Sequence, residues 1–296
     1  MKKWTETRQP AGRFAYVNGR YLRHGQAGVH VEDRGLQLGE AVYEVCNVRG
    51  GRLIDEEPHL DRLERSLREI HVAMPMHRAA LKQVLRELVA RNRIADGLLY
   101  IQVSRGPAKR DHVAPPGMGR PSLIVTLRPQ DIASANARTE QGVQVVTRPD
   151  IRWARRDIKT TQLLPNLMAK TEARAQGGYE AWLVEDDGTV TEGASTNAWI
   201  VTNKGEVVTR DLSHAILAGV TRKMILEAAR EAQIKVVERA FTLAEAKGAK
   251  EAFLSSATGA CVPVVAIDGV AVGDGKPGAL TRRLRDLYAA KAGIEN

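Results

Sequence analysis

The sequence predicts a protein of mixed α/β class with two domains, and three observations support this prediction. Its 296 residues are enough for two medium-sized domains, each with its own core. Strand-like and helix-like patterns alternate along the whole chain. Periodicity is lost around residues 127–136, as expected of a connection between domains. We therefore predict an N-terminal α/β domain over residues 1–128, an interdomain linker over 129–137 and a C-terminal α/β domain over 138–296.

The N-terminal part contains hairpin and helix signals. Hairpins are predicted at Asn18-Gly19 and Gly50-Gly51, because such pairs favour tight turns between strands. Apolar residues at helical spacing predict two helices, one with Leu60, Leu63, Leu67 and Ile70 and one with Leu81, Val84, Leu85, Leu88 and Val89. Residues 98–106 then have the pattern of a strand.

The C-terminal part repeats this alternation. Strands are predicted at about 143–147 and 251–255, and helices at about 164–176, 220–233 and 278–290. Turns are predicted at Asp187-Gly188, at 203–205 and at Asp268-Gly269.

Composition narrows the class of protein. With 43% hydrophobic and 27% charged residues, the chain is typical of a folded globular protein. Residues Met1–Glu6 lack the apolar stretch of a signal peptide, and the longest apolar run, about eight residues, is too short to span a bilayer. We expect a cytoplasmic protein without a membrane segment, in which Cys46 and Cys261 are buried thiols and no metal is bound.

The net charge of +9 favours anionic ligands without identifying one. Nucleic acid is one possibility, since basic clusters such as "RWARR" bind phosphate backbones. The 35 acidic residues are interspersed among the basic ones, and only 4% of residues are aromatic. No motif typical of nucleic-acid binding is visible, so we expect no nucleic-acid partner.

Lys159 is the first candidate for chemistry. It stands between an Arg-rich segment and an apolar helix, where burial and the charges of Arg155 and Arg156 would lower its proton affinity. An amine of this kind forms Schiff bases. Taken alone, the segment is more typical of a solvated basic surface.

Two further signals lie downstream. Glu192 precedes Gly193 and Ala194, which leave room for a planar ligand whose ring nitrogen it would pair, although a carboxylate satisfied within a turn is the simpler alternative. Gly219, Val220 and Thr221 open a predicted helix, and free N–H groups at a helix N-terminus attract phosphate. Such a helix start is also common without any ligand.

Three further candidate binding residues, Arg62, Arg110 and His112, lie upstream of Lys159. If the segment after the strand at 98–106 is extended, Arg110 and His112 point to the same side and would grip a carboxylate. An exposed charged loop is the alternative. Arg62 lies beside the apolar stripe of the first helix, where packing does not require an arginine, and we expect it to be solvated unless an anion lies over it. Together these residues supply an amine, an acid, a phosphate cradle and a carboxylate grip, the set that pyridoxal 5'-phosphate needs to act on an amino acid.

Several motifs, in order along nearly the whole chain, resemble those of the class IV aminotransferases, a pyridoxal-phosphate family of fold type IV. They include "EDRGLQLGEAVYEV" (32–45), "HLDRLERSL" (59–67), "YIQVSRGPAKRDH" (100–112), "DIRWARRDIK" (150–159), "VTEGASTN" (190–197), "ILAGVTR" (216–222) and "FLSSATGACVPV" (253–264). Within the family the chain looks most like the D-amino-acid transaminases.

The resemblance implies a smaller N-terminal α/β domain, a larger barrel-like C-terminal domain and an active site between them at a homodimer interface. It implies that Lys159 carries the cofactor as a Schiff base and transfers the substrate proton, and that Glu192 pairs with the pyridine nitrogen. The other implied cofactor-binding residues are Arg62, Leu217, Val220, Thr221, Ser256 and Ala257. Tyr43, Arg110 and His112 would bind the substrate carboxylate, the last two across the dimer interface.

The implied reaction is ping-pong transfer of the amino group of a D-amino acid, such as D-alanine, to a 2-oxo acid such as 2-oxoglutarate. The Arg110/His112 pair favours this reaction over that of a branched-chain L-amino-acid transaminase, and 4-amino-4-deoxychorismate lyase is a second alternative on the same fold. In one departure from the family pattern, Ala257 replaces a hydroxyl residue and can offer phosphate only its backbone N–H.

Overall fold

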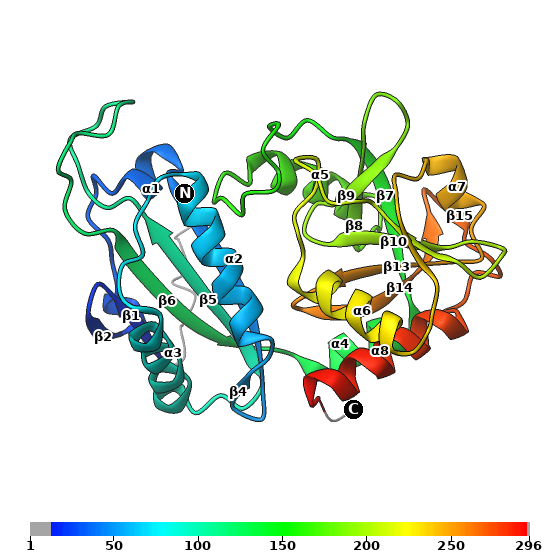
Figure 1. Ribbon diagram of the computed structural model, residues 1–296, viewed down its shortest axis with the longest axis horizontal. Coiled ribbons are helices and arrows are strands. Elements are labelled where there is room, and N and C mark those ends of the chain that lie inside the picture. Colours follow the sequence, from blue (N-terminus) through cyan, green and yellow to red (C-terminus); the bar gives the residue numbers. More distant parts are fainter. Residues whose placement is uncertain (1–12, 295–296) are drawn as a thin grey trace, which may run out of the picture. The chain divides into compact units, whose positions relative to one another are not determined.

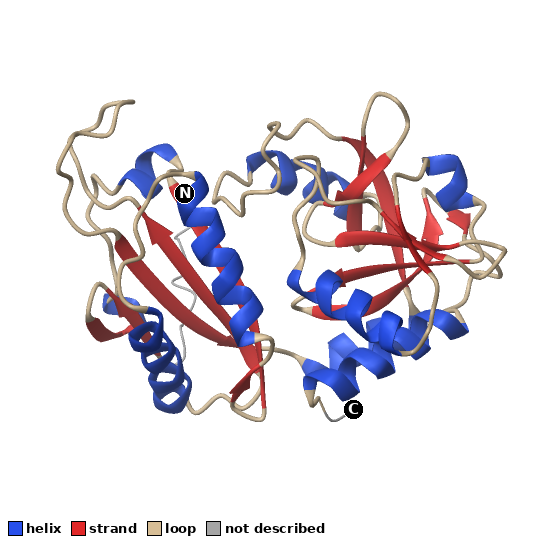
Figure 2. Cartoon of the chain, in the orientation of Figure 1, coloured by secondary structure: helices blue, strands red, loops and turns tan. Residues whose placement is uncertain are grey.

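The computed structural model describes residues 13–294, which form two compact units of mixed α+β structure (Figures 1 and 2). The first unit ends at Gln130 and also includes the short segment Lys159–Thr161. The second consists of Asp131–Ile158 and the chain from Gln162 onward. The fold class agrees with the prediction, whereas Met1–Glu6, which we searched for a signal peptide, lie outside the described residues.

The first unit is built on an antiparallel sheet of six strands in the order β2-β1-β6-β5-β3-β4. Its strands are β1 (Phe14–Val17), β2 (Arg20–Arg23), β3 (Ala41–Arg49), β4 (Arg52–Leu53), β5 (Gly97–Ser104) and β6 (Ser122–Pro129). Its helices are the 3-10 turn η1 (His24–Gln26), α1 (Arg34–Leu38), α2 (Glu56–Glu69) and α3 (Arg78–Asn92). Helices α2 and α3 lie on the same face of the sheet (Figure 1).

Alternation along β3 and β5 gives the two faces of this sheet different characters. Glu44 and Cys46 point to one face with Ile101, and all three are fully buried. Tyr43 points to the other face, where it is paired with Gln102 and is near Tyr100. This second face carries polar and aromatic side chains and is therefore a candidate location for a functional site.

The second unit contains a sheet in the order β12-β11-β10-β13-β14-β7-β8-β9, with β15 paired to β14. Its strands are β7 (Val143–Pro149), β8 (Glu180–Val184), β9 (Val190–Gly193), β10 (Asn197–Val201), β11 (Val207–Thr209), β12 (Val236–Glu238), β13 (Glu251–Ser256), β14 (Gly259–Ile267) and β15 (Val270–Ala271). Its helices are α4 (Ile132–Gln141), α5 (Leu164–Ala175), α6 (Val220–Glu231), α7 (Leu243–Lys247) and α8 (Ala279–Ala292). Parallel pairs join β7 to β8 and β14 and join β11 to β12, so the sheet is mixed.

The segment 129–137, predicted to be a linker, differs from that prediction in its local structure. It contains the end of β6 and the first turns of α4, which begins after Asp131. The Asp131 side chain caps this helix by accepting hydrogen bonds from the N–H and hydroxyl of Ser134. No residue of α4 is buried, so no apolar periodicity marks it in the sequence. The position of a domain boundary there stays a prediction.

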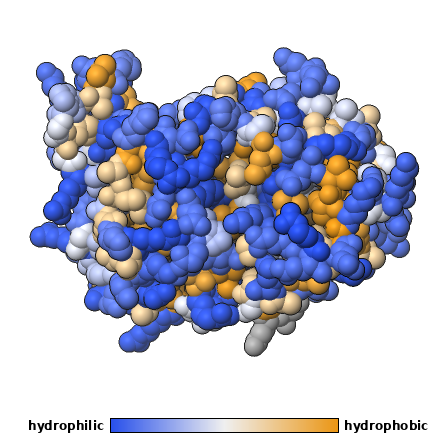
Figure 3. Space-filling model, in the orientation of Figure 1, coloured by the Kyte–Doolittle hydropathy of each residue, from blue (hydrophilic) through white to orange (hydrophobic). Residues whose placement is uncertain are grey.

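The predicted hairpins and main helices are confirmed, with ends that shift by a few residues. Cys46 and Cys261 are free, buried thiols, also as expected. Within residues 13–294, no helix is both long and apolar enough to cross a membrane. Most of the face seen in Figure 3 is polar, with apolar side chains in scattered patches.

Candidate active site

Lys159 is held by the edge of β3 within the first unit. Its carbonyl accepts a hydrogen bond from the Tyr43 N–H at 2.9 Å, and the Thr161 N–H donates to the Ala41 carbonyl at 3.0 Å. An isolated bridge pairs Thr160 with Val42. These backbone contacts fix the position from which the lysine side chain starts, while the amine itself lies over the Tyr43 ring, 4.3 Å from its centroid. The face of a tyrosine ring attracts an ammonium group.

Tyr43 belongs to a small polar and aromatic group on this face of the sheet. Its ring stacks on Tyr100 at 5.5 Å between centroids, and the Tyr100 hydroxyl donates to Gln102 Oε1 at 2.6 Å. Burial, with a smaller contribution from Tyr43, raises the pKa of Tyr100 to about 12. Tyr100 therefore stays a neutral hydrogen-bond donor throughout the physiological range. Sequence reasoning missed Tyr100 and Gln102, although their alternation in β5 placed both on one face.

Arg62 is buried, which corrects the expectation that it is solvated. The anion over it is Glu44, whose carboxylate accepts from Arg62 Nε at 2.7 Å and from Nη2 at 2.8 Å. His59 Nδ1 lies 2.8 Å from the same carboxylate. Burial would raise the pKa of Glu44, but the charge of Arg62 and the hydrogen bonds from Arg62 and His59 outweigh it and lower this pKa to about 2. Arg62 thus joins α2 to β3 on the sheet face opposite Tyr43.

Glu192 lies in β9 of the second unit and is 4% exposed, so it is not a turn carboxylate. Arg152 donates to it through Nη1 at 2.6 Å and to Asp150 through Nη2 at 2.7 Å. Burial raises the pKa of Glu192, and the opposing charge of Arg152 does not fully cancel this effect. Arg152 was not among the predicted site residues; its signal was the Asp-x-Arg spacing after β7.

Backbone and amide groups connect Glu192 to the start of α6. The Leu217 N–H donates to both carboxylate oxygens, at 3.2 and 3.1 Å. Asn197 Nδ2 donates to Glu192 Oε2 and to the Leu217 carbonyl, both at 3.0 Å. Asn197, which sequence reasoning also missed, therefore holds together the strand that carries Glu192 and the segment that leads into α6.

Helix α6 begins as predicted, with Gly219 at the N-cap and Val220 and Thr221 in the first turn. No side chain caps this N-terminus, although both of these first-turn residues are buried. Its N–H groups and dipole therefore suit an anion. A Cβ on Gly219 would lie 2.0 Å from Asn197 Oδ1, so only glycine leaves room here for the amide that holds Glu192.

Ser256 and Thr258 lie at the turn between β13 and β14, where their hydroxyl oxygens are 2.9 Å apart. The neighbouring Ser255 pairs with Asn197 across β13 and β10, which places the turn close to the amide that holds Glu192. Ala257 lacks a hydroxyl, as the sequence shows, but Thr258 supplies one beside Ser256. The turn therefore retains two hydroxyl groups despite the alanine.

Arg110 and His112 are exposed in the loop between β5 and β6, and this segment is not a strand. The condition under which an extended backbone would align the two side chains is therefore not met, and the segment is the exposed loop that the sequence offered as the alternative. The bend arises locally because the Asp111 carboxylate accepts a hydrogen bond from the Val113 N–H at 3.0 Å. Tyr43, Lys159, Arg110 and His112 all belong to the first unit, whereas Glu192, Leu217, Val220, Thr221, Ser256 and Ala257 belong to the second.

The arginines before Lys159 are paired with carboxylates. Arg155 bonds Asp157, and Arg156 bonds Glu185 at 2.7 Å. With Arg152 bound to Asp150 and Glu192, all three arginines of "RWARR" form ion pairs. The cluster is thus neither an uncompensated basic surface nor a set of free charges beside Lys159.

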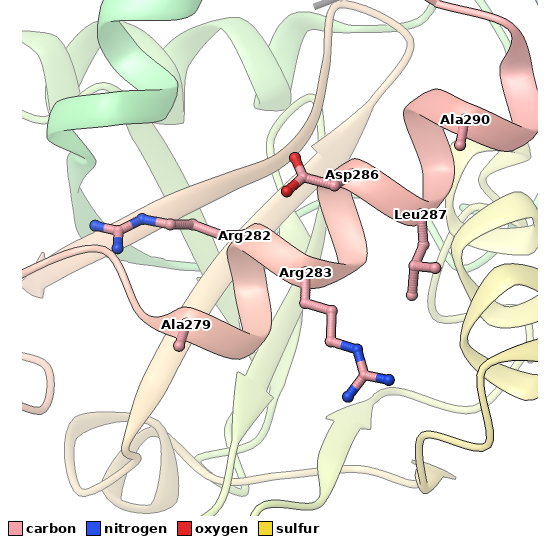
Figure 4. A pocket seen from close by; sticks show the side chains of 6 residues that line it. All are labelled: Ala279, Arg282, Arg283, Asp286, Leu287 and Ala290. Atoms are coloured by element: carbon pink, nitrogen blue, oxygen red, sulfur yellow. The ribbon is translucent and has the colours of Figure 1, made fainter.

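A surface hollow along α8 is lined by Ala279, Arg282, Arg283, Asp286, Leu287 and Ala290 (Figure 4). It contains none of the predicted site residues. In the described part of the chain, no group of three or more His, Cys, Asp or Glu side chains is arranged to bind a metal ion.

Comparisons with known proteins show which family the chain resembles. Residues 41–267 match the family model described as amino-transferase class IV. The chain is 38% identical to a D-alanine aminotransferase of Bacillus licheniformis over 268 residues, which cover 90% of this chain and 93% of that protein. It is 36% identical to a D-alanine aminotransferase of Staphylococcus haemolyticus over 274 residues, covering 92% and 95% of the two chains.

Solved structures share the fold. A branched-chain amino acid aminotransferase of Escherichia coli superposes with a TM-score of 0.87 at 23% identity, covering 96% of this chain and 97% of that one. A hypothetical aminotransferase from Mycobacterium tuberculosis in a PLP-bound form gives 0.81 at 24% identity, with 94% and 98% coverage. The family model spans well over half of the chain, and the curated relatives span nearly all of it. The chain therefore belongs to the class IV aminotransferases.

Proposed function

We propose that this aminotransferase transfers the amino group of a D-amino acid, D-alanine or a similar one, to a 2-oxo acid such as 2-oxoglutarate. The observation that carries the proposal is the near full-length similarity to proteins named D-alanine aminotransferase, at 38% identity for the Bacillus licheniformis protein. The loop with Arg110 and His112 supports it, because guanidinium and imidazole N–H groups can donate hydrogen bonds to a substrate carboxylate.

Pyridoxal 5'-phosphate is the cofactor that the second unit fits. A buried carboxylate whose pKa is raised, Glu192, suits a protonated ring nitrogen, and the uncapped start of α6 suits a phosphate. Val220 and Thr221 would bind that phosphate together with Ser256 and the Ala257 N–H, and Leu217 would line the ring. Arg62, held by Glu44, is assigned to the phosphate through the family resemblance alone.

When bound, the cofactor supplies an aldehyde and a ring that accepts electrons. Lys159 would bind the aldehyde and then move the proton at the substrate Cα, acting as general base and acid. Tyr43 would orient both the amine, which lies over its ring, and the substrate carboxylate. Because one amine reaches Cα from one side only, the position of the carboxylate selects the enantiomer.

The active enzyme would be a homodimer in which Arg110 and His112 serve the partner's site. Burial of exposed large apolar side chains in a dimer interface would favour association. Val31, Leu36 and Val113 are exposed in the first unit, and Leu164, Leu167 and Met168 on α5 in the second. The two free thiols support a reducing compartment such as the cytoplasm.

A three-way assay separates the proposal from the two other reactions that the fold supports. Pyruvate formation from D-alanine is measured with and without 2-oxoglutarate, beside turnover of L-leucine and of 4-amino-4-deoxychorismate. We expect pyruvate from D-alanine only when the acceptor is present. If the enzyme turns over L-leucine but no D-amino acid, the chain would instead be a branched-chain L-amino-acid transaminase. Pyruvate released from aminodeoxychorismate without an acceptor would identify a lyase.

A further inference from the structure

Arg110 and His112 lie in the long loop that connects β5 to β6. This loop contains no helix or strand and extends past the ends of both strands (Figures 1 and 2). Its backbone is nevertheless held at this point. Nη1 of Arg34 donates to the Asp111 carbonyl at 2.7 Å, and Nη2 donates to the His112 carbonyl at 3.4 Å. One guanidinium group therefore binds two successive carbonyls, next to the two side chains assigned to the substrate.

Arg34 is built into the protein rather than lying on its surface. It is 3% exposed, and its charge is balanced by Glu40, which accepts from its Nε. Its backbone N–H also donates to the Gly106 carbonyl at 3.1 Å, where the loop begins. A buried arginine is costly unless it is paired and its donors are used, and here the loop carbonyls use two of them.

The residues around Arg34 are densely hydrogen-bonded and closely packed. The Asp33 carboxylate accepts from the Gly35 N–H and from the Ser104 hydroxyl, both at 2.9 Å. A Cβ at Gly35 would lie 2.7 Å from Ser104 Cβ, so the start of α1 packs directly on the end of β5. Glu40 also accepts from Nε of Arg105, whose other nitrogens donate to the Ile70 and His71 carbonyls. This network attaches the base of the loop to the end of α2.

We propose that Arg34 is a positioning residue for the substrate carboxylate. It fixes the backbone from which the Arg110 and His112 side chains project, and so reduces the ordering cost of binding. The inference rests on the proposed function, which assigns Arg110 and His112 to the carboxylate. Arg34 itself touches neither substrate nor cofactor.

The test compares Arg34→Lys with a matched control, Arg105→Lys, in the enzyme loaded with its cofactor. Both variants keep a positive charge for Glu40, but the single nitrogen of a lysine cannot reproduce the spread of Nε, Nη1 and Nη2, which reach the carboxylate and the two carbonyls separately. For Arg34→Lys we expect KM for D-alanine and for 2-oxoglutarate to rise about tenfold or more, with kcat and the visible absorbance of the cofactor little changed. Arg105→Lys should alter KM much less, because Arg105 contacts carbonyls outside the loop.

A double-mutant cycle separates positioning from a general structural effect. In an enzyme that already carries Arg110→Ala and His112→Ala, Arg34→Lys should raise KM no further. KM does not depend on how much of the enzyme is folded, so the comparison holds even if the variant is less stable. An unchanged KM for Arg34→Lys, or the same rise in both backgrounds, would overturn the inference. If Arg110→Ala and His112→Ala themselves leave KM unchanged, the proposed carboxylate site fails instead.

Discussion

The neighbours of Lys159 in the structure differ from those that its sequence suggests, and they bear on its chemical role. In the sequence Lys159 follows a run of arginines, and the local pattern alone favours a solvated basic surface. In the structure Arg152, Arg155 and Arg156 are each bound to carboxylates, and the lysine amine lies over the Tyr43 ring instead. The backbone around it is clamped to β3. The backbone at Lys159 is therefore held in place, and its amine has an aromatic neighbour. Both features suit a residue that acts on a bound molecule.

Replacement of Lys159 by alanine should abolish transamination and leave the fold intact. Loss of a positioned general base costs about a hundredfold or more, and loss of the cofactor attachment adds to this. The measurement is the rate with D-alanine and 2-oxoglutarate, alongside circular dichroism. Lys170→Ala is the control, because the Lys170 amine contacts Glu180 and Ser195 instead. Full activity of Lys159→Ala together with loss in Lys170→Ala would move the reactive amine to Lys170.

At the scale of elements, hydrogen bonds around Glu192 join β9, β10 and the segment that leads into α6. Glycine at 219 matters because a Cβ there would lie 2.0 Å from Asn197 Oδ1. We expect Gly219→Ala to displace Asn197 and weaken cofactor binding about tenfold, since hydrogen bonds to a charged group are lost. Titration of the apoenzyme with pyridoxal phosphate measures the change. Gly28→Ala, where an added Cβ meets nothing within 4 Å, should bind the cofactor normally. Equal affinities in the two variants would contradict this account of Gly219.

The junction of β3 and α2 predicts a pH dependence of stability. The pKa of Glu44 is lowered from 4.5 to about 2 in the folded protein, so its stabilising contribution is present above about pH 4.5 and is lost as the pH falls towards 2. Below pH 4.5, the free energy of unfolding of the wild type should therefore fall faster than that of Glu44→Gln, by about 1.4 kcal/mol per pH unit. Urea unfolding at a series of pH values provides the measurement. Parallel curves for the two proteins would show that the Glu44–Arg62 pair does not shift this pKa.

Helices with an apolar stripe and hairpins with a typical two-residue turn could be predicted from the sequence. Elements without these patterns could not. Helix α2 was visible because Leu60, Leu63 and Leu67 face the core, and the first hairpin because Asn18-Gly19 favours a tight turn. Helix α4 buries no residue, so no apolar periodicity predicted a helix there. The candidate site residues were predicted from sequence motifs. Arg152 and Asn197 were not predicted, because their contacts with Glu192 span 40 and 5 positions, respectively. The burial of Arg62 depended on Glu44, a partner that helical spacing alone does not reveal.

At the scale of the whole molecule, the predicted site residues divide between two units. The lysine and the carboxylate-binding candidates belong to the first, and the acid and the phosphate-binding candidates to the second. Residues 159–161 belong to the first unit although the chain on either side of them belongs to the second. Under the proposed function, activity would therefore depend on both units, and in the proposed homodimer it would also depend on a second copy of the chain.

A complementation experiment tests whether the active site is shared between subunits. At a D-alanine concentration far below KM, Lys159→Ala subunits are expected to be inactive and Arg110→Ala subunits to have little activity, because their KM is raised. If Arg110 serves the partner's site, a mixed dimer has one site free of both changes. Random reassociation of equal amounts should therefore restore about a quarter of wild-type activity. A mixture that remains inactive although mixed dimers form would place Arg110 in the site of its own subunit.

The most direct test of the central claim is the half-reaction of the purified, cofactor-loaded enzyme with paired D- and L-amino acids. The visible absorbance of the bound cofactor is followed after each addition, and 2-oxoglutarate is then added. We predict that D-alanine bleaches this absorbance, that 2-oxoglutarate restores it and that L-alanine and L-leucine leave it unchanged. Bleaching by L-leucine with no response to any D-amino acid would contradict the account.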